Sequence, residues 1–181
     1  MNAIPTASRY SGVAIALHWL LALLIVGTFC VGLYMHELPL SPTRLKLYNW
    51  HKWAGATILA LSAVRLLWRL THRPPVDPPL PAWQRWAAHG AHGALYGLFF
   101  LVPLAGWAYS SAAGFPIVVF GVLPLPDFVA PDRALAEVLK QRHATLAFGL
   151  AAVVALHIAA ALKHHFIDRD GLLDRMRPAR R

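Results

Sequence analysis

The chain has 181 residues, 57% hydrophobic and 14% charged, whereas about a quarter of the residues in a soluble domain are charged, so an ordinary soluble globule is excluded. Its single cysteine, Cys30, excludes an internal disulfide framework, a cysteine-rich zinc site and an iron–sulfur cluster. The net charge of +9, combined with long apolar segments, indicates contact with the anionic headgroups of membrane lipid and no nucleic-acid partner.

Two membrane spans are predicted in the first half of the chain. Residues 12–36 contain no Asp, Glu, Lys or Arg and exceed the about 18 apolar residues expected of a transmembrane helix. Residues 48–70 are a weaker candidate, because the uncharged core of this segment is short. We still expect a span there, with Lys52 extending to one interface and Arg65 facing the bundle interior.

Two more spans follow a proline-rich linker at residues 73–83, which cannot continue a helix. They are expected at residues 91–113 and 143–163, each with a long uncharged interior. Residues 114–142 connect these two spans, and the prolines in this connection break any long helix. Asp132 is expected to cap a short separate helix there, which ends before the fourth span.

The four spans predict an all-α fold, an integral membrane four-helix bundle that forms one domain over residues 1–181. An even number of spans places both termini on the same side of the membrane. With Arg65 counted as intramembrane, that side carries ten Lys and Arg residues, against six on the opposite side. Because positive residues accumulate on the cytoplasmic side, we expect both termini to be cytoplasmic.

Four histidines fall at two matching depths in these spans. His143 and His157 are 14 residues apart, so on a helix they lie about 21 Å apart and within about 40° of the same face. His51 begins the second span on the outer side, level with His143. His18 lies early in the first span on the inner side, level with His157. The sequence therefore predicts two pairs, one near each membrane surface.

Paired imidazoles from facing helices suit a six-coordinate haem iron, which changes oxidation state with little rearrangement. A zinc site would need three or four ligands at one level, and none beyond each pair is evident. The alternative is that these histidines are hydrogen-bonding groups in helix packing. Arg65 lies 14 residues after His51 and is predicted to neutralise a haem carboxylate at the inner level, the alternative being extension to the inner headgroups.

The chain resembles the bacterial cytochrome b561 family over nearly its whole length. The resemblance rests on six motifs in a fixed order, which are "ALHWL", "WHKWAG", "VRLLWRL", "AHGAHGALY", "RHATLA" and "LHIAAALKHHF". It implies a bacterial inner-membrane protein with two b-type haems, whose iron ligands are His18, His51, His143 and His157. In the best-known members, electrons enter at the outer haem from superoxide and leave to ubiquinone. Other members are cytochrome b subunits of hydrogenases or partners of periplasmic redox proteins, which is the alternative function.

Three residues are expected to serve the substrates that this resemblance implies. Lys52 and Arg142 adjoin the two outer histidines, and a basic funnel there would attract superoxide and speed its association. The alternative is that they contact headgroups or haem carboxylates. His164 follows His157 by two helical turns and is predicted to donate a proton to the quinone, unless it only caps the span end. A non-redox proton-coupled transporter is disfavoured, because the spans contain no Asp or Glu.

Overall fold

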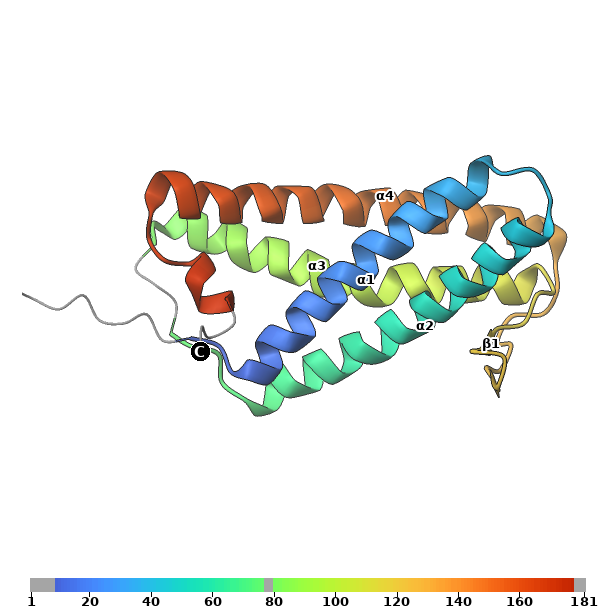
Figure 1. Cartoon of the computed structure of the whole chain (residues 1–181), viewed down its shortest axis with the longest axis horizontal. Helices are drawn as coiled ribbons and strands as arrows, with labels where there is room; N and C mark the ends of the chain where they lie inside the picture. Colours follow the sequence, from blue (N-terminus) through green and yellow to red (C-terminus); the bar gives the residue numbers. More distant parts are fainter. Residues whose placement is uncertain (1–8, 77–79, 178–181) are drawn as a thin grey trace, which may run out of the picture.

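The computed structural model describes residues 9–76 and 80–177, and in this part of the chain four long helices form an elongated bundle (Figure 1). The helices are α1 (Gly12–Glu37), α2 (Pro42–Thr71), α3 (Ala82–Ala112) and α4 (Arg133–Lys163). The short elements are β1 (Val118–Val119), β2 (Leu123–Pro124), the π-helix η1 (His164–Asp168) and the 3-10 helix η2 (Leu173–Met176). The predicted all-α membrane bundle is thus confirmed.

Three of the four helices begin at a side chain that caps their free backbone N–H groups. The Ser11 hydroxyl accepts a hydrogen bond from the N–H of Ala14 at the start of α1. Ser41 does the same for α2, where Pro42 occupies the first turn and lacks the N–H that would otherwise be unsatisfied. Asp132 caps α4 through the N–H of Leu135, so its predicted capping role is confirmed.

The helices extend beyond the spans expected from the sequence, because the expected bounds followed uncharged residues. α2 begins before residue 48, and α3 begins before residue 91. The separate helix expected after Asp132 is wrong, since α4 continues without a break from Arg133 through His143. Charged residues in these first turns do not end a helix at the membrane interface, where their side chains reach water. Part of the linker, residues 77–79, and the last arginines, at 180 and 181, lie outside the described residues.

The outer surface of the bundle is suited to lipid. All four long helices are long and apolar enough to cross a membrane. Large apolar side chains point outward along them, with Leu23 72% exposed on α1 and Leu156 69% exposed on α4. Exposing such an apolar surface to water would cost free energy, whereas contact with the hydrocarbon of a bilayer carries no such cost. The chain is therefore a multi-pass membrane protein.

The buried core is small and draws on every long helix. Leu21 and Ile25 of α1 pack with Ile58 of α2, Leu95 of α3 and Leu150 of α4. Leu150 lies seven positions from both His143 and His157 on α4, which is about 10 Å along the helix in either direction. An apolar layer therefore separates the two levels at which the histidines lie.

Both described chain ends lie at the same end of the bundle (Figure 1). Tyr10 donates its backbone N–H to the carbonyl of Arg175, and the indole of Trp19 donates to the carbonyl of Met176. We call this the inner end. The opposite end, which carries the β1–β2 hairpin, is called the outer end. As the even number of spans predicted, the described ends share one side of the membrane.

Candidate functional site

At the outer end, the imidazoles of His51 on α2 and His143 on α4 face each other. Their ring centroids are 6.0 Å apart and the ring planes are nearly perpendicular, at 88°. Each Nδ1 lies within hydrogen-bond distance of a backbone carbonyl, that of Thr28 for His51 (3.2 Å) and that of Val102 for His143 (3.0 Å). Because a carbonyl only accepts, each Nδ1 carries the proton, and each Nε2 keeps a free lone pair for a metal.

Two glycines make room for these outer imidazoles. A Cβ on Gly32 of α1 would lie 3.1 Å from Cε1 of His51. A Cβ on Gly106 of α3 would lie 3.0 Å from Cε1 and 3.1 Å from Nδ1 of His143. Each glycine lies one helical turn after the carbonyl that its histidine binds, so the absent side chain lets the ring reach that carbonyl. The arrangement is the same on both sides of the pair.

At the inner end, His18 on α1 and His157 on α4 form the second pair, with ring centroids 6.2 Å apart. A third imidazole, that of His92 on α3, lies 5.5 Å from the ring of His157. Arg65 on α2 is close enough to act electrostatically on all three rings. The structure thus brings together the four histidines in the two pairs expected from their depths, and it adds His92 to the inner level.

The distance between the rings fits one iron between each pair. Two metal–imidazole bonds of about 2 Å, plus about 1 Å from each nitrogen to its ring centre, span about 6 Å. The observed separations are 6.0 and 6.2 Å. Among the residues that the structure describes, the group of at least three close metal-ligating side chains is His164, Asp168 and Asp170, which belongs to neither pair. Among these described residues the outer pair has no third imidazole beside it, and at the inner level the rings of His18, His92 and His157 do not bring three ligand atoms together as a zinc site requires. Two opposed imidazoles at each level therefore suit a haem better than zinc.

Several buried polar atoms have no hydrogen-bond partner in the described part of the chain. They are Arg44 Nε, Arg65 Nη1, Trp107 Nε1 and Ser62 Oγ. Arg44 lies two turns before His51, and Trp107 follows the glycine beside His143. Buried polar groups are almost always bonded, so these atoms indicate a missing polar partner at each level. The carboxylates of a haem are such partners, and the residues present therefore fit this group.

The two basic residues expected to form the outer funnel lie in different environments. The ammonium group of Lys52 donates to Ser110 Oγ (3.3 Å) and to the carbonyls of Phe115 (3.2 Å) and Pro116 (3.4 Å). These hydrogen-bond partners are neutral, and the carboxylate of Asp127 is close enough to act electrostatically on the ammonium. Arg142 is exposed on α4. Sequence reasoning missed that Lys52 also anchors the connection between α3 and β1.

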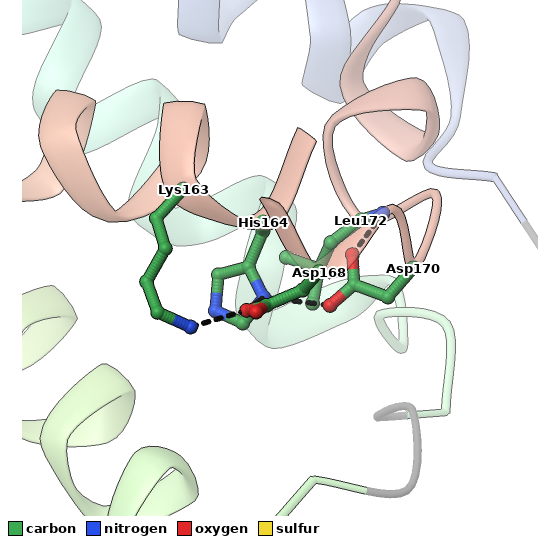
Figure 2. A network of polar contacts seen from close by, with 5 residues as sticks. All are labelled: Lys163, His164, Asp168, Asp170 and Leu172. Carbon is green, nitrogen blue, oxygen red and sulfur yellow. Dashed lines mark hydrogen bonds and ion pairs between the residues drawn. The ribbon is translucent and has the colours of Figure 1, made fainter. Parts of the chain in front are cut away.

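At the inner end, His164 begins η1, and two carboxylates approach the same nitrogen of its imidazole (Figure 2). Its Nδ1 is 2.6 Å from Asp170 Oδ2 and 3.2 Å from Asp168 Oδ2. Lys163 pairs with the same oxygen of Asp168, and the other oxygen of Asp170 accepts the N–H of Leu172. The imidazole is therefore part of a polar network, which the helical spacing alone did not predict.

This fold and this site define a class of protein, the multi-pass membrane cytochromes b that carry electrons. Residues 9–179 match the family described as prokaryotic cytochrome b561, and the chain belongs to that family, as its motifs indicated. Membership implies haem b as the cofactor.

Three relatives cover nearly the full length of the chain. Cytochrome b561 homolog 2 of Escherichia coli (strain K12) is 37% identical over 97% of this chain and 95% of its own length. Cytochrome b561 homolog 1 of the same organism is 34% identical over 96% of this chain and 99% of its own length. A protein of Yersinia pestis named probable superoxide oxidase CybB is 31% identical, over 96% and 98% of the two chains.

Proposed function

We propose that this protein carries electrons from superoxide at the outer end, through two b-type haems, to ubiquinone at the inner end. The observation that carries the proposal is the presence of two imidazole pairs of matching separation, one at each end of the bundle. His51 and His143 bind the outer haem, and His18 and His157 bind the inner one. The similarity to a probable superoxide oxidase supports the choice of donor.

Each haem supplies a reversible one-electron change, and the side chains of this protein set the conditions for it. The carbonyls that bind His51 and His143 hold both rings in one tautomer and one orientation. Arg65 supplies a buried positive charge for the carboxylates of the inner haem. We also propose that the inner end faces the cytoplasm of a bacterial inner membrane, which the excess of positive residues at that end supports.

The electron balance assigns a role to each end. Two superoxide ions each lose one electron and become O2, while one quinone gains two electrons and two protons and becomes a quinol. Protons are therefore needed only at the inner end. His164, whose Nδ1 is approached by Asp168 and Asp170, is the proposed proton donor there. Lys52 and Arg142 are the proposed basic residues that attract superoxide at the outer end.

Replacing Arg142 with Gln is expected to slow haem reduction by superoxide severalfold and to reduce its salt dependence, because one charge of the funnel is lost. Stopped-flow absorbance with a superoxide source, at rising ionic strength, measures both effects. The effect of changing Arg142 is easier to interpret than that of changing Lys52, because the Arg142 side chain is exposed. Lys52→Gln should add to the effect, but it also frees the connection to β1.

Ser110→Ala is the control for the loss of the hydrogen bonds by which Lys52 holds the connection between α3 and β1. It removes the hydroxyl that Lys52 binds and leaves the charge in place, so its reduction rate should stay near that of the parent. If the rate ignores both salt and the loss of these charges, the funnel is wrong. A parent protein that superoxide does not reduce at all favours the alternative, a cytochrome b subunit that receives electrons from a dehydrogenase or another redox partner protein.

Replacing His164 with Gln is expected to slow the oxidation of the reduced haems by quinone about a hundredfold or more, because general acid catalysis contributes factors of this size. Haem reduction by superoxide should be unchanged, since it takes place at the other end. Anaerobic stopped-flow with a short-chain ubiquinone measures the oxidation step. His165→Gln is the matched control, because the same imidazole is lost one position away, outside the carboxylate pairs of His164. Equal slowing in both variants would count against His164 as the donor.

A further inference from the structure

A cavity of about 620 Å³ opens at the inner end between α1, α2 and α3. The described residues that line it include no aspartate or glutamate, but they include four arginines, which are Arg9, Arg65, Arg69 and Arg73. Neither His18 nor His157 lines the cavity, so it lies beside the inner pair and not between its rings. His92 and Arg65 connect the two regions.

The cavity contains more guanidinium groups than the two carboxylates of the inner haem can neutralise. Arginine stays protonated in proteins, and four guanidinium groups around one space create a strong attraction for anions. The bonds seen for Arg9 and Arg69 leave their charges uncancelled. Arg9 donates to the carbonyl of Arg177, and Arg69 lies 6.0 Å over the ring of Tyr96. The two carboxylates of one haem neutralise at most two of the four, so positive charge remains at the mouth to attract a second anion.

The remaining wall of the cavity is apolar and aromatic. Trp68 and His72 stack with ring centroids 3.7 Å apart, and Pro74, Pro75 and Met176 complete this side. A ligand that fits must therefore combine an anionic group with apolar surface. A quinone headgroup is uncharged and cannot neutralise the guanidinium groups, whereas a phosphate is an anion that accepts several N–H donors from arginine.

We infer that this cavity binds a phosphate-bearing anion, and specifically the headgroup of an anionic phospholipid from the leaflet at the inner end. Arg9, Arg69 and Arg73 would hold the phosphate at the mouth, while the acyl chains would follow the apolar surface of the bundle. Basic pockets between transmembrane helices bind such headgroups by this combination of charge and depth. Since the inference assumes that Arg65 serves the inner haem, it rests in that respect on the proposed function.

Native mass spectrometry of the purified holoprotein tests this site by titration with phosphatidylglycerol, cardiolipin and phosphatidylcholine of the same acyl chains. We expect the two anionic lipids to bind and phosphatidylcholine to bind much more weakly. The double change Arg69→Gln and Arg73→Gln should lower the affinity for the anionic lipids by about twenty-five-fold, about fivefold for each lost charge. Arg85→Gln, at an exposed arginine outside the cavity, should leave it unchanged.

A charge-conserving variant and a second ligand complete the test. Arg73→Lys keeps the charge and should retain most of the lipid binding, which separates loss of charge from damage to the fold. Inorganic phosphate is titrated against the same variants, and if it binds at these arginines while phospholipid does not, the lipid assignment is overturned. Equal binding of all three lipids, or equal affinity in the double variant and the parent, also overturns it. The haem spectrum of each sample shows whether both haems remain, so failure of lipid binding is distinguishable from failure of the electron-transfer proposal.

Discussion

Replacing His143 with Ala is expected to release the outer haem and leave the inner haem bound, while replacing His157 with Ala does the reverse. Each change removes one of the two axial ligands at a single level, and an apolar layer separates the levels. The haem content should fall from two to one per chain in either variant. A pyridine haemochrome assay gives the content, and a redox titration identifies the haem that remains.

His92 requires a control in this experiment, because its ring lies 5.5 Å from that of His157 and is the nearest replacement ligand. The double variant His92→Ala and His157→Ala should lose the inner haem completely. His165→Ala should retain both haems. Equal loss of the two haems in a folded single variant, or full retention in both single variants, contradicts the pairing.

The second large effect is expected at Gly106, which sequence reasoning missed. Valine at this position would place its Cβ 3.0 Å from Cε1 of His143, and its two methyl groups would collide with the ring. The ring would have to move, and its hydrogen bond to the carbonyl of Val102 would be lost. Without that bond the ring would no longer be held in the orientation that directs Nε2 toward the iron. We therefore expect Gly106→Val to lose the outer haem nearly as completely as His143→Ala, with the inner haem retained.

Gly97→Val is the matched control for this prediction. Gly97 also lies on α3, its Cβ would meet no atom within 4 Å, and it is exposed. It is nine residues from Gly106, which places it about 180° around the helix. This variant should keep both haems. If Gly106→Val also keeps both haems with unchanged potentials, the proposed contact with His143 has no role in binding the outer haem.

The fold followed from the sequence because hydrocarbon imposes strong constraints. A long uncharged segment must form a helix to satisfy its backbone, and this identified three of the four spans without any contact information. The second span was predicted from a shorter uncharged core flanked by Lys52 and Arg65. The first turns of α2, α3 and α4 were missed because they contain charged residues, and the expected spans included only uncharged ones. Asp132 was identified as a cap from local chemistry, but the helix that it caps continues without a break to Lys163, with no proline in residues 133–163 to interrupt it.

The pairing of the four histidines was predicted from depth, because the helical rise converts sequence spacing into distance. The carbonyls that orient His51 and His143 were not predicted, since they belong to other helices and depend on which faces meet. The contacts of Gly32 with His51 and of Gly106 with His143 were not predicted either, because glycine in a membrane helix commonly marks close packing of any kind. The partners of Lys52 and His164 lie in loops and short elements, whose paths a helical pattern does not specify.

A spectroscopic redox titration of the purified chain, with its haem content measured on the same sample, tests the central claim most directly. We predict two b-type haems per chain that titrate as separate one-electron centres. Both should be low-spin when oxidised and when reduced, because imidazoles fill both axial positions of each iron. A single haem per chain, or a high-spin haem with an open axial position in the folded protein, would contradict the two histidine pairs.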